Sequence, residues 1–392
     1  YPKTRVGFAR DPNVGADVMG SARFSASSGS PNPRPEVESL HAYTAPLEGR
    51  RGLLRLDFNE NTIGPSPRVV EALRAIPADQ IAIYPEYDGL REAVVANLAA
   101  SGLAVPLQPA QVGLFNGVDA AIHAIFHSYG DRGDQLLTTS PTFGYYTPCA
   151  QMQGMEILAI PYEGSHFRFP LELISTILQE QRPKLLLLCN PNNPTGTRLA
   201  PEQVLELAVA APQSLVVVDE LYEAFTGDSV MPLANFAATP NLLVLRSLAK
   251  TAGLAGLRMG FAFGAADVVD RLARVTGPYD INSFAVTAAF AALADQPYVD
   301  AYVAEVMLAR DWLRSRLDAS GVRYHLDGGN YLLIWPRLPP SEVEAALRAE
   351  GILVRDMSGK SLIDGSLRVS IGTTKQMQRF WEAFATVESL SE

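Results

Sequence analysis

Two stretches of the chain combine glycine or asparagine with an apolar run in a way that could bind a ligand. LFNGVDAA (residues 114–121) has the pattern of a strand end, a glycine and a helix start. The first N–H groups of a helix have no partner within it, so those of Val118 and Asp119 would face an anion beyond Gly117. CNPNNPTG (residues 189–196) is a turn dense in Asn, Pro and Gly after another apolar run. An anion site and an amide-rich turn are therefore available.

Two further stretches supply a carboxylate, a phenol and an amine. VVVDELY ends an apolar run with Asp219 and places Tyr222 three residues later. RSLAK ends another apolar run with Ser247 and Lys250. Lys250 has no charged residue among the seven that follow it, whereas a lysine on a solvated helix normally has charged neighbours. This isolation indicates that the amine has a function.

Short β-branched or leucine-rich runs alternate with helical patterns along most of the chain. This alternation predicts an α/β fold with a mostly parallel sheet covered by helices on both faces. Ligands of such sheets bind beyond the carboxyl ends of the strands, so the four polar stretches should meet at one edge. Strands are predicted at residues 111–115, 135–140, 184–190, 214–220, 242–247 and 258–264, with helices at 117–130, 170–181 and 200–212.

Both ends of the chain differ from its centre. Residues 1–36 are rich in Gly, Ser, Pro and Asn, which predicts a flexible N-terminal tail. Residues 283–320 have the pattern of a long helix broken near Pro297, and two strand patterns separated by a helix follow it. Such a pattern predicts a smaller α+β domain. The predicted units are a large domain over 63–282 and a small domain made of 37–62 and 283–392.

Composition argues against several classes of function. The chain has a net charge of −10 and no basic patch, so we expect no nucleic-acid partner. No apolar run has the length of a membrane span, so we expect no membrane association. Cys149 and Cys189 form no CxxC and indicate buried thiols in a reducing compartment, so we expect a cytoplasmic protein. His123 and His127 share a helix face without the H-E-x-x-H pattern, so we interpret them as packed helix residues and expect no metal.

Ten motifs in a fixed order carry a resemblance to a known family. The chain resembles the fold-type I pyridoxal-phosphate-dependent aminotransferases of class I/II, and within them it looks like the histidinol-phosphate aminotransferase branch. The resemblance covers about Tyr43 to the C-terminus and implies an aspartate aminotransferase-like fold whose large domain binds pyridoxal 5'-phosphate. The motifs are LDFNEN, YPEYDG, NGVDAAI, SPTFGYY, NPNNPTG, VVDELY, SLAK with GLAGLRMG, NYLLI, VRD and LRVSIG.

The resemblance assigns the central chemistry to Lys250, Asp219 and Tyr222. Lys250 would carry the cofactor as a Schiff base and move a proton once substrate frees it. Its apolar surroundings and the nearby Arg258 would lower its pKa. Asp219 would pair with the pyridine nitrogen, while Asn193 and Tyr222 would bind the ring oxygen O3'. The other implied cofactor contacts are Val118, Asp119, Ser247 and Arg258 at the phosphate, Phe143 on the ring face, and Tyr84 from a second subunit.

The resemblance also implies the substrates and the assembly. Arg368, with Asn193, would hold the acidic group of the substrate. Arg355, and Tyr43 from the partner chain, would bind the phosphate of histidinol phosphate. The implied reaction converts histidinol phosphate and 2-oxoglutarate to imidazole acetol phosphate and glutamate, as a step of histidine biosynthesis. Shared sites of this kind imply a homodimer.

Two positions depart from the family pattern. Ala249 stands where relatives often have a second hydroxyl residue, which removes one phosphate hydrogen bond worth about 0.5–1.5 kcal/mol. Phe143 stands where many relatives have tyrosine, and it keeps the stacking face. Neither departure disables the site.

Other interpretations of the same residues remain open. The S-x-x-K pattern at Lys250 also marks penicillin-binding serine enzymes, but their S-D-N and K-T-G companions are missing. No G-x-G-x-x-G follows a strand, so a dinucleotide site is weakly supported. Within the fold, the alternatives are a transaminase for aromatic or other amino acids and a decarboxylase. A cofactor-binding protein that has lost turnover is an alternative of a different class.

Overall fold

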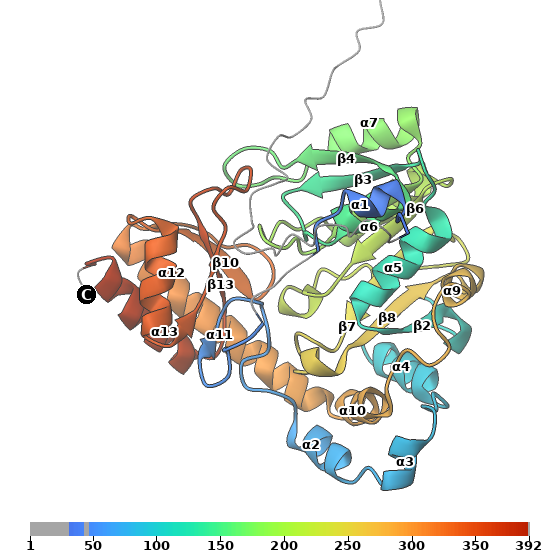
Figure 1. Cartoon of the computed structure of the whole chain (residues 1–392), viewed down its shortest axis with the longest axis horizontal. Coiled ribbons are helices and arrows are strands. Elements are labelled where there is room, and N and C mark those ends of the chain that lie inside the picture. The colour runs from blue at the N-terminus through green and yellow to red at the C-terminus, as the bar shows by residue number, and fades with distance from the viewer. Residues whose placement is uncertain (1–30, 43–46, 391–392) are drawn as a thin grey trace, which may run out of the picture.

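The structure of the protein is a computed structural model that describes residues 31–42 and 47–390 (Figure 1). Most of the predicted flexible tail, residues 1–30, lies outside the described residues, as does Tyr43. Residues 31–36 of the tail are described, and the short helix α1 (Pro35–Glu38) begins there. Arg34 of this segment donates a hydrogen bond to the Met152 carbonyl at 2.6 Å.

Within the described part of the chain, a seven-stranded sheet has the strand order β2-β8-β7-β6-β5-β3-β4. Its strands run in parallel except β8, which is antiparallel to both β2 and β7. β5 and β6 are buried along their whole length, as their continuous Leu and Val runs require for strands covered on both faces. The strands are β2 (Val112–Asn116), β3 (Gln135–Ser140), β4 (Glu156–Pro161), β5 (Leu185–Cys189), β6 (Leu215–Asp219), β7 (Leu242–Ser247) and β8 (Met259–Gly264).

Helices α4 to α10 lie around this sheet, whereas α2 packs on α10 and, with α3, lies farther from the sheet (Figure 1). α5 packs on β2 and β8 and begins directly after β2, so its first turn lies at the same edge as the carboxyl ends of the parallel strands. The helices of this part of the chain are α2 (Pro67–Arg74), α3 (Ala78–Ala82), α4 (Leu90–Ala99), α5 (Val118–Tyr129), α6 (Tyr146–Gln153), α7 (Leu171–Gln181), α8 (Pro201–Ala210), α9 (Ala266–Ala273) and α10 (Ser283–Leu293).

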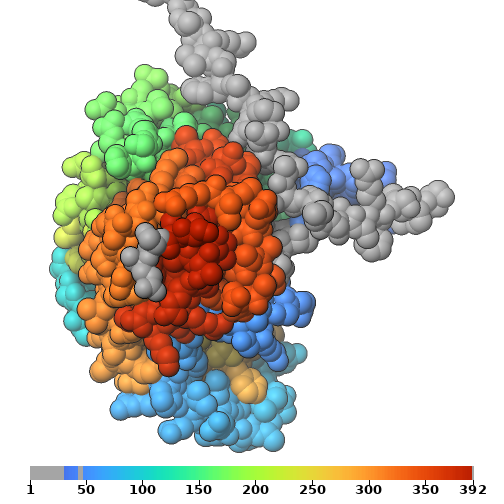
Figure 2. All heavy atoms as spheres, turned by 90° about the vertical axis from the view of Figure 1, so that its left-hand side faces the viewer, coloured from blue at the N-terminus to red at the C-terminus, as the bar shows by residue number. Residues whose placement is uncertain are grey.

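A second, four-stranded sheet lies beside the first, with the order β12-β13-β10-β9, and the N-terminal strand β1 pairs with β11. Figure 2 shows the C-terminal residues, orange to red, as one face with N-terminal residues in blue beside them. The strands are β1 (Leu54–Arg55), β9 (Arg323–His325), β10 (Tyr331–Trp335), β11 (Ile352–Leu353), β12 (Arg355–Asp356) and β13 (Leu367–Ser370). The helices are α11 (Gln296–Ser320), α12 (Pro340–Ala349) and α13 (Thr374–Val387).

The predicted α/β fold with a mostly parallel sheet is confirmed. Every strand and helix predicted above is present within a few residues, and the long helix breaks at Ala294 and Asp295, so that Pro297 lies in the first turn of α11. One large group of buried side chains lies between Leu90 and Ala289, and a second joins Leu54 and Leu56 to residues 302–384. The division into two domains stays a prediction, which these two cores support.

Candidate active site

The four polar stretches meet at one edge of the large sheet. Asp219 is the last residue of β6 and Ser247 the last of β7, while Asn193 follows the end of β5. These strands are parallel, so their carboxyl ends lie side by side. Arg258 precedes β8 at the same edge because β8 runs in the opposite direction. The sequence prediction that these stretches converge is therefore confirmed.

Lys250 is held at this edge by a backbone carbonyl. Its Nζ donates a hydrogen bond to the Phe58 carbonyl at 2.9 Å. Burial lowers the pKa of Lys250 to about 8, and the charge of Arg368 contributes more to this shift than Arg258 does. Sequence reasoning named the apolar surroundings and Arg258, but Arg368, from a distant part of the chain, is the more influential cation. The amine is thus neutral part of the time at mildly alkaline pH, as a nucleophile or base must be.

Asp219 is a buried carboxylate with one oxygen in a strong hydrogen bond. The Tyr146 hydroxyl donates to its Oδ2 at 2.6 Å. Among the described residues, Oδ1 has no hydrogen bond of ordinary geometry, although the Leu221 N–H is near enough to lower the carboxyl pKa. Burial outweighs both bonds and raises the pKa of Asp219 to about 7. A buried carboxylate with a free oxygen is suited to pair with a cationic N–H group of a ligand.

Tyr222 and Asn193 form a network with a third residue, Asn59. The Tyr222 hydroxyl accepts hydrogen bonds from the side-chain amides of Asn193 and Asn59, each at 3.2 Å. Arg368 donates to Oδ1 of Asn193 at 2.7 Å and Ser370 donates to Oδ1 of Asn59 at 2.9 Å, which fixes the orientation of both amides. Because its oxygen accepts from both amides, Tyr222 has its own O–H left as a donor.

The start of α5 and Arg258 lie together where the sequence predicts an anion site. Gly117 precedes the helix with φ 78°, and a Cβ there would lie 2.6 Å from Nη2 of Arg258. A Cβ on Gly260 would lie 2.6 Å from the amide nitrogen of Val118. The guanidinium also donates to the Asp119 carboxylate at 2.7 Å. Glycines at both positions therefore let a cation and free N–H groups share one small space.

Ser247 lies beside this space as the strand partner of Gly260, whereas Phe143 packs on Tyr146. Ser247 donates its hydroxyl to the Met259 carbonyl at 3.0 Å, and its oxygen accepts from the N–H of Ala249, also at 3.0 Å. Phe143 is half-buried and meets the ring of Tyr146 edge to face, with centroids 5.4 Å apart. Since Tyr146 binds Asp219, Phe143 lies one ring away from that carboxylate. A role for either residue in holding a cofactor stays a prediction.

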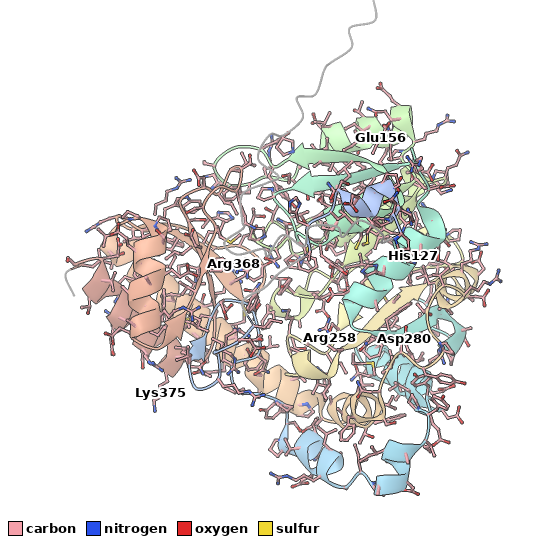
Figure 3. The ribbon with its side chains drawn as sticks, in the orientation of Figure 1. His127, Glu156, Arg258, Asp280, Arg368 and Lys375 are labelled. Atoms are coloured by element: carbon pink, nitrogen blue, oxygen red, sulfur yellow. The ribbon has the colours of Figure 1, made fainter. Side chains whose placement is uncertain are left out.

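Arg355 and Arg368 approach the site from the four-stranded sheet. They are direct cross-strand partners between β12 and β13. Arg368 donates to Asn193 and, at 2.5 Å, to the Asp57 carbonyl. The guanidinium carbon of Arg355 lies 5.9 Å from the centre of the Phe58 ring. Figure 3 shows Arg368 on the C-terminal sheet and Arg258 on the large sheet, so the two parts of the protein each supply an arginine.

Tyr84 is not joined to these residues by any hydrogen bond or ion pair that the described residues make. It follows α3, is 71% exposed and stacks on Tyr279 with centroids 4.2 Å apart. Tyr43 lies outside the described residues. The predicted roles of both tyrosines therefore stay predictions.

Sequence reasoning missed three contributors to the site. Tyr146 occurs in SPTFGYY and Asn59 in LDFNEN, two motifs that supported the family resemblance without any role for these residues. The third contributor, Arg50, precedes LDFNEN by six residues and binds the two acidic residues of that motif, Asp57 and Glu60, as described below. No pattern in the sequence shows that Tyr146, and not the tyrosine directly before it, points into the site. Only the presence of Tyr146 and Asn59 in the two motifs could have indicated a role for these residues.

The two helix histidines differ from the expectation that both are packed. His123 is half-buried and hydrogen-bonded to the Tyr145 hydroxyl, whereas His127 is exposed. Within residues 31–42 and 47–390, no group of three or more His, Cys, Asp or Glu side chains is arranged to hold a metal ion. No helix among these residues is both long enough and apolar enough to cross a membrane.

Comparison with known proteins gives a consistent result. The family model described as aminotransferase class I and II matches residues 51–384. The chain belongs to the class I and II aminotransferases. It is 34% identical over 341 residues to the histidinol-phosphate aminotransferase of Symbiobacterium thermophilum, which covers 86% of this chain and 90% of that protein. The predicted family and the predicted transaminase activity are thereby confirmed.

Solved structures share the fold. The histidinol-phosphate aminotransferase of Sinorhizobium meliloti, solved in complex with pyridoxal-5'-phosphate, has a TM-score of 0.80 and 24% identity and covers 92% of this chain and 99% of its own. A tetra mutant of the Thermus thermophilus aspartate aminotransferase has a TM-score of 0.75 and 24% identity, and it covers 91% and 99%. The predicted aspartate aminotransferase-like fold is confirmed.

The residues at the strand ends fit pyridoxal 5'-phosphate, the cofactor of this family, so the cofactor prediction is confirmed. The free oxygen of Asp219 is placed for a ring N–H, and the glycine-lined start of α5 beside Arg258 suits a phosphate. Lys250 supplies a buried amine of lowered pKa within the same group of residues. The donor set therefore matches the three chemical parts of this cofactor.

Proposed function

We propose that this aminotransferase transfers the amino group of histidinol phosphate to 2-oxoglutarate, giving imidazole acetol phosphate and glutamate. The relatives matched over most of the chain are named for histidinol phosphate, at 31–35% identity. Histidine biosynthesis is then the pathway served. A cytoplasmic location stays a prediction, which the two free buried cysteines support.

The observation that carries the proposal is the cross-strand pair of Arg355 and Arg368. Directly opposed side chains of an antiparallel pair have Cβ atoms about 5 Å apart, and like charges there are destabilising. An anion between the two guanidinium groups removes that repulsion. A phosphate has three acceptor oxygens and about two negative charges, so it uses both arginines more fully than a carboxylate does.

The same pair can serve both halves of the reaction. Glutamate and 2-oxoglutarate carry a side-chain carboxylate, which one arginine fork binds through two parallel hydrogen bonds. Arg368, held between Asn193 and the Asp57 carbonyl, is the better fixed of the two arginines and is suited to that fork. Arg355 then adds the further donor that a phosphate requires.

When bound, pyridoxal phosphate supplies an electron sink for the electron pair that remains at the substrate α-carbon after its proton is removed. Lys250 accepts that proton, because burial and then Arg368 keep the pKa of its amine near 8. Asp219 would bind the ring nitrogen through its oxygen Oδ1, which has no hydrogen-bond partner of ordinary geometry among the described residues, and would keep a proton there. Tyr222 would donate its O–H to the ring oxygen O3', since Asn193 and Asn59 already donate to the Tyr222 oxygen.

The other predicted cofactor contacts keep their proposed roles. The N–H groups of Val118 and Asp119, with Ser247 and Arg258, would bind the phosphate at the start of α5. Phe143 would pack on the ring face, held there by its contact with Tyr146. The missing hydroxyl at Ala249 leaves this phosphate with one donor fewer.

We also propose a homodimer in which Tyr84 reaches the phosphate of the partner's cofactor. Large apolar side chains are exposed around it: Ile81 is 58% exposed, Ile83 52% and Tyr279 55%. Exposed apolar patches of this kind are typical of interfaces between subunits. Tyr43 would come from the partner chain to the substrate phosphate. The two cores described above support the proposed large and small domains.

Replacing Arg355 tests the substrate. Arg355→Ala should lower kcat/KM for histidinol phosphate about 10- to 150-fold more than kcat/KM for glutamate, as expected for the loss of a charge-assisted bond of about 1.5–3 kcal/mol. Arg323→Ala is the matched control, because Arg323 lies on β9 at the opposite edge of the same sheet. Equal losses on both substrates would mean that Arg355 only supports the fold, and faster turnover of phenylalanine than of histidinol phosphate would refute the substrate.

A further inference from the structure

Two predicted functional cations are held by consecutive carbonyls of one short loop. The segment Asp57–Glu60, called loop 57–60 here, connects the N-terminal strand β1 to the site. The Asp57 carbonyl accepts a hydrogen bond from Nη2 of Arg368 at 2.5 Å, and the Phe58 carbonyl accepts one from Nζ of Lys250 at 2.9 Å. The position of this loop therefore sets the resting positions of the Lys250 amine and the Arg368 guanidinium relative to each other.

Arg50 binds both ends of this loop. Its Nε and Nη2 donate to the two carboxylate oxygens of Asp57 at 3.0 and 2.6 Å. Its Nη1 and Nη2 donate to the carboxylate of Glu60 at 3.1 and 2.8 Å. The guanidinium carbon lies 4.4 Å from the centre of the Phe58 ring, over the residue between them. One planar, rigid group thus makes four charge-assisted contacts that bracket the two carbonyls.

Burial makes the contacts between Arg50 and Asp57 costly to break. Arg50 is 7% exposed and Asp57 5%, so neither charge can exchange its partner for water. A neighbouring arginine provides the contrast: Arg55 reaches Glu60 through a single contact of 3.2 Å, and its side chain is 36% exposed. An exposed contact of that kind contributes little, whereas breaking a buried bidentate pair is costly.

Neutral groups also hold the loop through Asn59, whose side chain binds Tyr222 and Ser370 as described above. The N–H of Asn59 donates to the Ser370 hydroxyl at 2.8 Å, and the Asn59 carbonyl accepts from the side-chain amide of Asn330 at 3.3 Å. These bonds act on Asn59, one residue beyond the Phe58 carbonyl. On the other side of the loop the backbone of Leu56 is bound to Leu353 and Ser370, whereas Asp57 itself is bound through its side chain by Arg50 and through its carbonyl by Arg368.

We propose that Arg50 is a positioning residue: by binding Asp57 and Glu60 it fixes loop 57–60, and so holds the Lys250 amine and the Arg368 guanidinium where the reaction needs them. The proposal rests on the functions proposed above for Lys250 and Arg368. Arg50 itself contacts neither the amine nor substrate. Lysine in its place keeps the charge but cannot bind both carboxylates through a planar fork.

Chemical labelling of the cofactor-free protein tests the proposal without using transaminase activity. Reductive methylation at about pH 9.5, above the Lys250 pKa of about 8, measures access to a largely neutral amine. Peptide mass spectrometry gives the rate at Lys250 relative to Lys375, an exposed lysine on α13 (Figure 3) that serves as internal reference. We expect this ratio to rise roughly fivefold in Arg50→Lys and Arg50→Gln, the factor for one lost hydrogen bond.

The controls separate positioning from general stability. Arg55→Gln should leave the ratio unchanged, although it touches the same Glu60. Glu60→Gln keeps the Arg50–Asp57 pair and should give an intermediate ratio. If circular dichroism shows that Arg50→Gln does not fold, Glu60→Gln is used in its place. A folded Arg50→Lys variant and Glu60→Gln variant that both keep the wild-type ratio would overturn the proposal, as would an equal rise in Arg55→Gln. The labelling ratio does not depend on the substrate. A protein that is inactive towards histidinol phosphate can therefore still show the expected ratios, so failure of the positioning proposal can be told apart from failure of the substrate proposal.

Discussion

Replacing Asp219 with asparagine should stabilise the cofactor-free protein while it removes activity. The carboxyl is 2% exposed, and burial raises its pKa from 3.8 to about 7. One pKa unit corresponds to about 1.4 kcal/mol, so a shift of about three units means that the ionised form costs about 4 kcal/mol of folding stability. The folded pKa lies above the unfolded one, so between these values the folded protein holds a proton that the unfolded chain has released. Wild-type stability therefore falls as pH rises through this window and levels off above it.

Asparagine lacks this titration. Its Oδ1 can still accept the hydrogen bond of Tyr146, so the variant keeps the strong contact and loses the buried charge. The difference in unfolding free energy, variant minus wild type, should grow from about pH 4 to about pH 7 and approach 4 kcal/mol at about pH 8. Urea unfolding of both cofactor-free proteins at pH values on either side of this window measures the difference.

The loaded enzyme should respond in the opposite sense. A neutral amide cannot keep the ring nitrogen protonated, so turnover should fall by about 3–5 kcal/mol in activation free energy, as for other lost electrostatic contacts to a reaction centre. A variant that is no more stable than wild type at about pH 8 would refute the assignment of a costly buried charge to Asp219. Near-normal turnover would refute its role at the ring.

Two further predictions concern the neighbours of Asp219. Lys250→Ala should abolish borohydride fixation of the cofactor, whereas wild type should be labelled at Lys250; label on Lys360 instead would contradict the assignment of the reactive lysine. Tyr146→Phe should lower turnover by about 1.5–3 kcal/mol, the worth of a hydrogen bond to a charged group. Because the Tyr146 bond lowers the pKa of Asp219, its loss should move the acid limb of the pH–rate profile to higher pH, and a shift to lower pH would show that the bond acts otherwise.

The strand ends of the site could be predicted because parallel strands place their carboxyl ends at one edge. Asp219, Ser247 and Lys250 each follow a buried apolar run, and that alone brings them together. The strand that sequence reasoning missed in the large sheet, β4, is an edge strand whose short apolar run, residues 157–160, is buried only at Ile160. A half-exposed strand gives a weaker signal than a buried one.

Contacts between distant parts of the chain could not be predicted. Arg50 and Arg368 both act on loop 57–60, yet they are more than 300 residues apart, and only the packing of the two sheets brings them to it. The same packing makes Arg368 a stronger influence on Lys250 than Arg258, which is only eight residues away in sequence. The hydrophobic periodicity of a helix or strand indicates which of its faces is buried, but it does not indicate which other segment of the chain packs against that face.

A half-reaction tests the central claim most directly. The purified yellow enzyme is mixed with histidinol phosphate and no acceptor, and both the visible absorbance and the product are followed. We predict that the absorbance is lost with one imidazole acetol phosphate formed per site, and that 2-oxoglutarate restores the absorbance with formation of glutamate. Release of carbon dioxide from a phosphorylated amino acid, or an enzyme bleached by phenylalanine or aspartate but not by histidinol phosphate, would contradict it.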